Sequence, residues 1–150
     1  MTFDDLRSLI ASAEYHKFLK VEPVEADQEK GEEVLKLAFD PAYTIFAKAG
    51  NYHGGVTAAL IDVAGAMACS VMTGYPTPTI NLRVDYMQAP RRTGLTARGE
   101  VRRIGRAIGV ADVTITDDAG EICVIGRGTF STVDPRPKLM TPEAGSAGTE

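Results

Sequence analysis

The chain has no tryptophan, only two cysteines and no excess of positive charge. Cys69 and Cys123 match no C-x-x-C spacing, which argues against a redox pair, a zinc knuckle or a disulfide framework. Sixteen Lys and Arg residues against twenty Asp and Glu residues give a net charge of −4, so nucleic acid is not an expected partner. No cluster of metal-ligating side chains is visible either, and we expect neither a metal site nor a bound cofactor.

The sequence also lacks a secretory signal, because its first thirty residues have no positively charged start followed by an apolar stretch. A cytoplasmic protein is therefore expected. With 150 residues, 44% hydrophobic and 24% charged, the composition is that of one globular domain. We assign this domain to residues 1–133. Residues 134–150 show no periodicity, and we expect a flexible C-terminal tail.

The hydrophobic pattern predicts a short helix, two strands, a long helix and then four strands. Apolar residues recur at helical spacing over residues 3–15, which predicts a helix. Residues 18–26 contain Pro23, which predicts that they form an edge strand or a bulged strand. Residues 35–39 alternate as a half-buried strand, with a hairpin expected at Gly31. The later strand candidates are 80–86, 95–102, 107–116 and 121–133. Their short connections contain Gly, Pro or Asp, which predicts that successive strands are antiparallel neighbours.

The long helix, Gly54 to Thr73, is apolar or small almost throughout, and Asp62 is its only charge. A membrane-spanning helix is disfavoured, because an acid near mid-span costs about 2.5–3.5 kcal/mol on insertion scales. No membrane partner is therefore expected. A helix that is apolar nearly all round is buried in a larger fold, and this one would be roughly 30 Å long. The pattern predicts an α+β fold in which a curved antiparallel sheet of five to six strands wraps one central helix.

His53, Gly54 and Gly55 stand immediately before this helix, where backbone N–H groups are unpaired and the helix dipole is positive. Glycine lets a ligand atom approach these N–H groups, which can bind an anion or the oxyanion that develops on a carbonyl. The alternative is structural: the two glycines form a flexible helix entry and His53 is only a cap.

Asp62 is the second candidate functional residue, because a lone carboxylate in an apolar helix is costly to bury. Its helical face carries only small residues, which admit either a substrate or a closely packed neighbouring helix. These residues are Gly55, Ala58, Ala59, Gly65, Ala66 and Cys69.

The spacing of Gly55 and Asp62 limits how both could act on one substrate. Seven helical residues separate their backbones by about 10 Å along the axis, so one carbonyl group cannot easily contact both. A two-fold dimer, in which Gly55 of one chain faces Asp62 of the other, is the simplest arrangement that brings them together.

These segments resemble the hotdog-fold thioesterases, in particular the phenylacetate-degradation (PaaI-like) branch. The stretch from His53 to Asp62 matches the HGG motif of this family, with the helix acid nine positions after the histidine. The stretch from Thr79 to Met87 resembles the strand that follows the central helix. The resemblance covers roughly residues 34–133.

The resemblance implies hydrolysis of acyl-CoA at paired sites on a dimer interface, often within a tetramer formed as a dimer of dimers. It implies that the Gly55 N–H polarises the thioester carbonyl and that Asp62 of the partner chain acts as base or nucleophile. It also implies that Thr79 places the water or the acid and that His53 contacts the thioester region. Further substrate contacts are expected from Asn51, Gly54 and Ala59.

One position departs from the family pattern. Many members have Asn or Gln six residues before the histidine, where this chain has Ala47. Asn51, two residues before the histidine, is the nearest polar replacement. The departure leaves the exact position of the attacking water open, and it keeps a non-catalytic acyl-CoA-binding protein as an alternative.

Coenzyme A carries phosphates, and two local basic clusters are candidates to bind them. Arg91 and Arg92 lie in the first expected hairpin after the helix, and Arg102, Arg103 and Arg106 lie in the next. Solvated hairpin charges are the alternative. A hydratase or dehydratase acting on an enoyl thioester ranks lower, because His16 and His53 are the only histidines. The acyl group, which the pattern restricts no further than small aromatic or short to medium chains, stays open.

Overall fold

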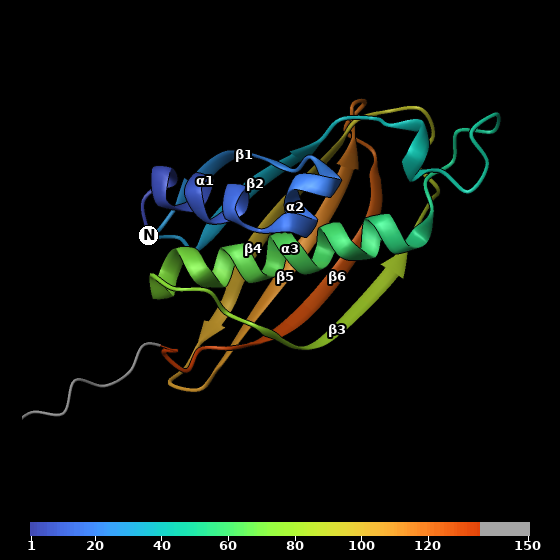
Figure 1. The fold of residues 1–150 in the computed structure, drawn as a ribbon. Helices are drawn as coiled ribbons and strands as arrows, with labels where there is room; N and C mark the ends of the chain where they lie inside the picture. Colours follow the sequence, from blue (N-terminus) through green and yellow to red (C-terminus); the bar gives the residue numbers. More distant parts are fainter. Residues whose placement is uncertain (136–150) are drawn as a thin grey trace, which may run out of the picture.

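A long helix lies in the concave face of a six-stranded antiparallel sheet (Figure 1). This arrangement comes from a computed structural model that describes residues 1–135, so residues 136–150 of the expected tail lie outside the described part. The sheet order is β1-β2-β4-β5-β6-β3. The strands are β1 (Glu22–Asp27), β2 (Glu32–Leu37), β3 (Thr79–Tyr86), β4 (Leu95–Ile104), β5 (Ile108–Asp117) and β6 (Ile122–Ser131). The α+β fold predicted from the sequence is confirmed.

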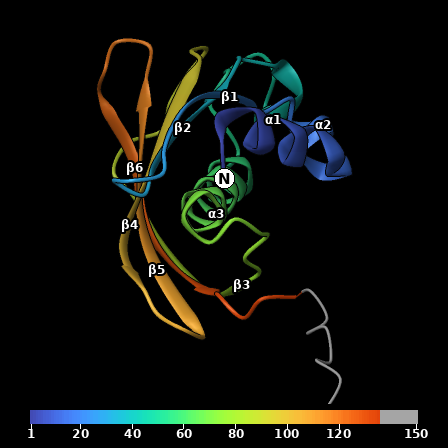
Figure 2. The same ribbon diagram turned by 90° about the vertical axis from the view of Figure 1, so that its left-hand side faces the viewer.

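The central helix, α3 (Gly54–Thr73), has the bounds that the sequence indicates. It ends at Gly74, whose positive φ of 82° closes the last turn. By length and composition alone this helix could cross a membrane, but 61% of its apolar window is buried inside the protein. Figure 2, viewed along the helix, shows the sheet curving around it. The apolar character of α3 therefore reflects its place in the core.

The N-terminal region contains two helices where the sequence predicts one over residues 3–15. These are α1 (Phe3–Ser12) and α2 (Glu14–Leu19), separated by Ala13 in an extended conformation. The periodicity continues through Ala13 because both helices bury apolar residues toward the same core, so the break leaves little trace in the pattern. Phe18, expected in a strand, belongs to α2, and β1 begins only at Glu22.

The predicted hairpins are confirmed in three cases and wrong in one. The β1–β2, β4–β5 and β5–β6 pairs are antiparallel neighbours, and Gly31 turns the first with a φ of 68°. The segment 87–94, however, does not form a hairpin. It connects β3 at one edge of the sheet to β4, which pairs with β2 and β5, while β3 pairs with β6. A short connection indicates a reversal of direction, whereas the choice of neighbour depends on contacts between distant segments.

Candidate active site

The His-Gly-Gly turn is held together by its own side chain. His53 caps α3, and its Nδ1 accepts a hydrogen bond from the Gly55 N–H at 2.9 Å. A neutral imidazole that accepts at Nδ1 carries its proton on Nε2. A Cβ atom on Gly55 would lie 3.0 Å from His53 Nδ1, so glycine at this position lets the cap form. The Gly55 N–H, which is expected to polarise a carbonyl, therefore already donates to His53 Nδ1. A substrate carbonyl would have to share this N–H group with His53.

Asp62 and Thr79, which lie far apart in sequence, are in direct contact. The Thr79 hydroxyl donates a hydrogen bond of 2.6 Å to Asp62 Oδ1. Asp62 is partly buried on α3, and Thr79 is the exposed first residue of β3. Within residues 1–135 the structure records no second hydrogen bond to this carboxylate. One of its oxygens is thus oriented by Thr79, while the other remains available to a water or an acyl group.

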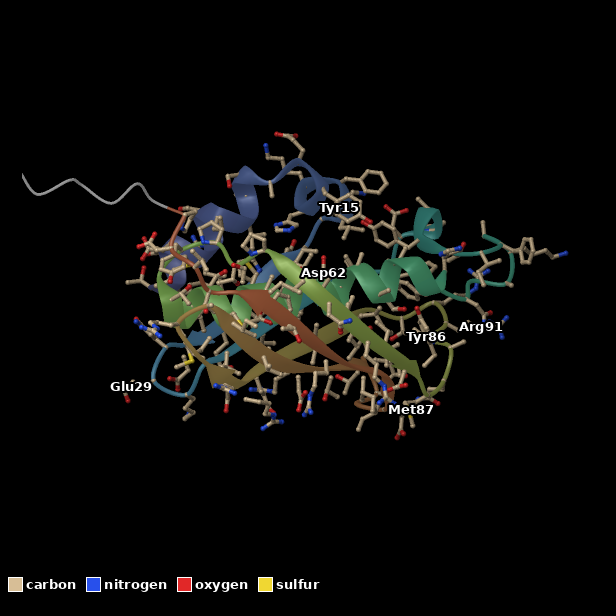
Figure 3. All side chains as sticks on the ribbon, turned by 90° about the horizontal axis from the view of Figure 1, so that it is seen from below. Tyr15, Glu29, Asp62, Tyr86, Met87 and Arg91 are labelled. Carbon is tan, nitrogen blue, oxygen red and sulfur yellow. The ribbon has the colours of Figure 1, made fainter. Side chains whose placement is uncertain are left out.

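The two halves of the expected site stay apart within one chain. Figure 3 shows Asp62 near the middle of α3, with Tyr86 and Arg91 toward the end where the helix begins. The hydroxyl of Tyr86, the last residue of β3, donates to the Gly54 carbonyl at 3.0 Å. Thr79 and Tyr86 are separated by roughly 23 Å of extended strand. β3 thus contacts the Asp62 region at one end and the His-Gly-Gly turn at the other.

The basic residues after β3 hold a neighbouring loop in this chain. Arg91 Nε donates to the Ala49 carbonyl at 2.7 Å, and Asn51 and Arg91 form a β-bridge. The Arg92 guanidinium donates to the Lys48 carbonyl at 2.6 Å. Both arginines are exposed, so their remaining donors face solvent. Asn51, which the sequence suggested as a polar replacement, lies in this loop beside the turn.

The second basic cluster lies near the other end of the molecule, where β4 passes into β5 (Figure 1). Arg102 forms ion pairs with Asp112 and Glu100. Arg103 and Arg106 are exposed. The structure therefore does not bring the two arginine clusters together within one chain. Ala59 is half-buried and packs against the main core cluster, one helical turn before Asp62.

A cavity of about 240 Å³ adjoins the His-Gly-Gly turn. Its lining residues are Tyr52, Gly54, Thr57, Tyr86, Gln88, Ala89 and Pro90. Tyr52 is 4% exposed, and its hydroxyl is fixed by the Thr93 carbonyl at 2.8 Å. Sequence reasoning missed Tyr86 and Tyr52 as site residues. The one available signal was the place of Tyr86 on the apolar side of β3.

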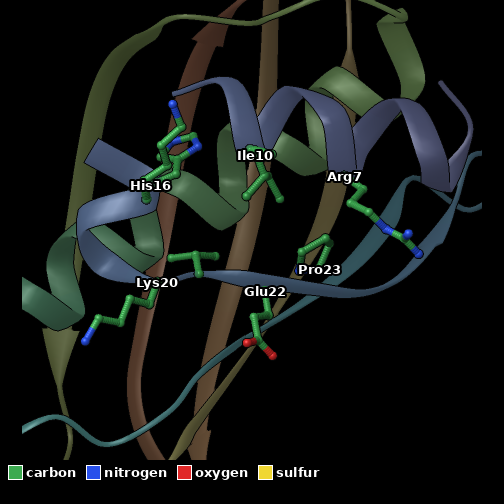
Figure 4. A pocket seen from close by; sticks show the side chains of 9 residues that line it. Arg7, Ile10, His16, Lys20, Glu22 and Pro23 are labelled. Carbon is green, nitrogen blue, oxygen red and sulfur yellow. The ribbon is translucent and has the colours of Figure 1, made fainter. Parts of the chain in front are cut away.

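A second groove lies between α1, α2 and β1, away from the His-Gly-Gly turn (Figure 4). His16 lines it, and its Nδ1 is buried without a hydrogen-bond partner in the described part of the chain. Burial lowers the pKa of His16, while the Ile10 carbonyl and the negative charge of Asp62 oppose that shift. His16 is therefore a neutral side chain at pH 7 that lies within electrostatic reach of Asp62.

Comparisons with known proteins identify the family to which the chain belongs. The sequence model of the Thioesterase superfamily matches residues 49–124. A putative esterase of Halobacterium salinarum is 35% identical over 142 residues, covering 85% of this chain and 92% of the relative. A medium/long-chain acyl-CoA thioesterase of Escherichia coli, YigI, is 33% identical over 81 residues, covering 44% of this chain and 52% of YigI.

Solved structures share the fold. The zebra fish thioesterase superfamily member 2 superimposes with a TM-score of 0.77 at 24% identity, covering 88% of this chain and 99% of that structure. The Escherichia coli PaaI protein from the phenylacetic acid degradation operon gives a TM-score of 0.73 at 22% identity, with coverages of 89% and 97%.

Proposed function

Because the chain belongs to the thioesterase superfamily and is a thioester hydrolase, we propose that it hydrolyses acyl-CoA with Asp62 as base or nucleophile. The observation that carries this proposal is the 2.6 Å hydrogen bond from Thr79 to Asp62 Oδ1. A carboxylate held by one oxygen on a partly exposed face of α3 is poised to act through the other. No metal and no cofactor, apart from the coenzyme A of the substrate, takes part in the proposed chemistry.

The reaction balances in either of two routes. As a base, Asp62 takes a proton from water while the hydroxide adds to the thioester carbonyl carbon. The C–S bond then breaks, the sulfur leaves with the electron pair, and the proton returns to it to give free acid and coenzyme A thiol. As a nucleophile, the carboxylate itself adds to the carbonyl, expels the thiolate and forms an anhydride that water hydrolyses.

The Gly55 N–H is the proposed donor to the carbonyl oxygen, where negative charge develops in both routes. In the free protein this N–H donates to His53 Nδ1. The substrate carbonyl therefore shares the N–H with His53 or replaces it as acceptor. If the substrate carbonyl replaces His53 as acceptor, the exposed imidazole is free to rotate about its side-chain bonds. Its Nε2–H can then donate to the thioester.

We further propose that the site is completed by two chains. Within residues 1–135, β3 is an edge strand that pairs only with β6, and we propose that its other edge pairs with a second copy. A two-fold axis near Leu82 or Arg83 would place Tyr86 and the His-Gly-Gly turn of one chain beside Thr79 and Asp62 of the other. This arrangement removes the separation of about 10 Å along α3. The proposed assembly is a homodimer that can associate further as a dimer of dimers.

The substrate proposal follows from the cavity and the arginines. A cavity of about 240 Å³ is smaller than sites for drug-sized ligands, so it favours a small aromatic or short to medium acyl group. Arg91 and Arg92, exposed near the same end of α3, are the proposed contacts for the coenzyme A phosphates. Arg103 and Arg106 would serve only across an interface between chains. Asn51, Gly54 and Ala59 are proposed to contact the substrate.

The mechanism is tested by thiol release from a panel of acyl-CoA thioesters. Replacing a general base typically lowers the rate by about 10²–10⁴-fold, so Asp62→Asn should lose at least about 100-fold in kcat. Asp27→Asn, at the β1–β2 turn, is the matched control and should retain wild-type turnover. Equal turnover by wild type and Asp62→Asn would refute the mechanism. Saturable binding without thiol release from any thioester would point to a non-catalytic acyl-CoA-binding protein.

The two-chain site is tested by mixing inactive variants. Gly55→Pro removes the N–H group in the first turn of α3, where no intrahelical hydrogen bond is lost, and Asp62→Asn removes the acid. Random exchange at equal amounts makes half of the dimers mixed, and each mixed dimer has one intact site of two. About a quarter of wild-type activity should therefore return. No recovery after verified exchange would mean that each site lies within one chain.

A further inference from the structure

Tyr86 connects the end of β3 to the start of α3. Its hydroxyl donates to the Gly54 carbonyl at 3.0 Å, and the Thr57 hydroxyl donates to the same oxygen at 3.0 Å. A Cβ atom on Gly54 would lie 3.3 Å from Cε1 and 3.4 Å from Cζ of the Tyr86 ring. The ring therefore lies directly against the backbone that begins the helix, and glycine at position 54 permits this contact.

The side of the Tyr86 ring that faces away from Gly54 is exposed. Tyr86 is 57% exposed although its hydroxyl is bound, and it lines the cavity beside Gly54 together with Tyr52 and Ala89. Aromatic rings provide a large, rigid contact area for apolar and aromatic groups. The half of Tyr86 that does not touch α3 is therefore available to a group that enters the cavity.

β3 contacts α3 near both of its ends. Pairing with β6 sets Tyr86 opposite Val124 and Thr79 opposite Phe130. Because Thr79 is bonded to Asp62 and Tyr86 to Gly54, one strand fixes two points on α3 at once. Loss of the Tyr86 hydroxyl would remove one hydrogen bond to the Gly54 carbonyl, while the Thr57 bond to that oxygen and the Asp62 contact stay in place.

We propose that Tyr86 is a positioning residue of the hydrolytic site through its hydroxyl and a specificity-determining residue through its ring. This inference rests on the proposed acyl-CoA thioesterase function. The hydroxyl holds Gly54, and with it the adjacent Gly55 N–H, at the place where the carbonyl oxygen is polarised. The ring forms the wall against which the acyl group packs.

Two substitutions separate the two roles, with acetyl-CoA and benzoyl-CoA as probes. Tyr86→Phe keeps the ring and loses one neutral hydrogen bond, so kcat should fall about fivefold for both probes with KM within about twofold of wild type. Tyr86→Leu should show the same loss of kcat. In addition, KM should rise at least about fivefold for benzoyl-CoA and stay unchanged for acetyl-CoA.

Tyr15→Phe and Tyr15→Leu are the matched controls, because Tyr15 is 55% exposed and stacks on Phe18 at 5.9 Å on α2, away from the turn. Both should behave as wild type. Thermal unfolding of each variant monitors folding, and Gly54→Ala, which pushes a methyl group toward an intact Tyr86, should reproduce the loss of kcat.

The possible failures are distinguishable. Absence of thiol release by the wild-type protein would refute the proposed function and this inference together. An active wild type with unchanged kcat in Tyr86→Phe and in Gly54→Ala would refute the positioning role alone. An equal change of KM for both probes in Tyr86→Leu would refute the specificity role.

Discussion

Glu33 is the residue whose placement is hardest to reconcile with a simple hydrophobic core. It lies on the face of β2 that also carries Leu35, it is 0% exposed, and neither carboxylate oxygen has a hydrogen-bond partner among residues 1–135. Burial raises the pKa of Glu33 well above its ordinary value, and the Gly99 backbone and the Arg98 charge oppose that shift only in part. The side chain is therefore protonated over a pH range in which an exposed glutamate is charged.

A stability measurement tests this. Above about pH 4.5 the unfolded chain loses the Glu33 proton while the folded protein keeps it, so the free energy of unfolding should fall as pH rises toward the folded pKa. Glu33→Gln removes this dependence. Urea unfolding should show the variant more stable than wild type at pH 8, with the difference decreasing toward pH 4.

Glu32→Gln is the control for that series, because Glu32 is half-buried and pairs with Arg98 at 3.3 Å. Its substitution should destabilise by at most about 1 kcal/mol over the same range. Parallel pH curves for wild type and Glu33→Gln would contradict the assignment of a raised pKa to Glu33.

Thr79 offers a second test at the scale of one residue. Thr79→Val keeps the shape but loses the hydrogen bond to Asp62, and bonds to charged groups contribute about 1.5–3 kcal/mol. Thiol-release assays should show kcat lowered about 10- to 100-fold. Thr79→Ser keeps the hydroxyl and should retain most of the activity. If valine and serine behaved alike, the hydroxyl would have no part in the proposed mechanism.

At the scale of elements, the distance between α3 and the sheet depends on small residues at their contact. A Cβ atom on Gly65 would lie 2.6 Å from the ring of Phe130 on β6. One on Gly126 would lie 2.5 Å from Ile61 of α3. Glycine on the helix thus receives a large side chain from the sheet, and glycine on the sheet receives one from the helix. The interdigitation holds α3 close enough for Thr79 to reach Asp62.

Gly65→Ala tests this packing. In an open helix the change would stabilise by about 0.5–1 kcal/mol, but the overlap with Phe130 should reverse the sign and destabilise by about 1–3 kcal/mol. Denaturant unfolding measures the effect. Phe130→Leu in the Gly65→Ala background should restore part of the loss, whereas strictly additive losses would show that the ring is not the obstacle.

At the scale of the whole molecule, β3 is an edge strand that exposes an apolar side chain to solvent in the single chain. Ile80 is 58% exposed on an edge strand whose side toward a second copy carries no partner strand within residues 1–135. Exposed apolar edges favour association. In the proposed two-fold pairing Ile80, which lies in a β-bulge between Thr79 and Asn81, belongs to the part of β3 that pairs with the other chain.

Ile80→Glu should therefore convert the proposed dimer into monomers and abolish thiol release, because it would bury an unpaired carboxylate at the proposed interface. Sedimentation velocity and the thioesterase assay measure both effects. Val24→Glu is the matched control, since Val24 is 47% exposed on β1 at the opposite edge of the sheet. A monomeric wild type, or a dimeric and active Ile80→Glu, would rule out the β3 interface.

The hydrophobic pattern determined the elements more reliably than their pairing. The bounds of α3 followed from composition and from the His-Gly-Gly turn, and three hairpins followed from connections that join neighbouring strands. The β3–β4 connection was wrongly predicted as a hairpin, because local residues encode a reversal and not a partner. The break between α1 and α2 at Ala13 was not predicted, because the apolar spacing continues across it.

The candidate site divides in the same way. The sequence by itself pointed to Gly55 and Asp62 as candidate site residues and predicted that helix geometry keeps them apart, since rise per residue is a local property. Only the tertiary structure placed the Thr79 hydroxyl on Asp62, Tyr86 on Gly54 and Glu33 beneath α3. These contacts join strands to a helix far away in the chain, and they exist only once the sheet has curved around α3 and brought both ends of β3 against it.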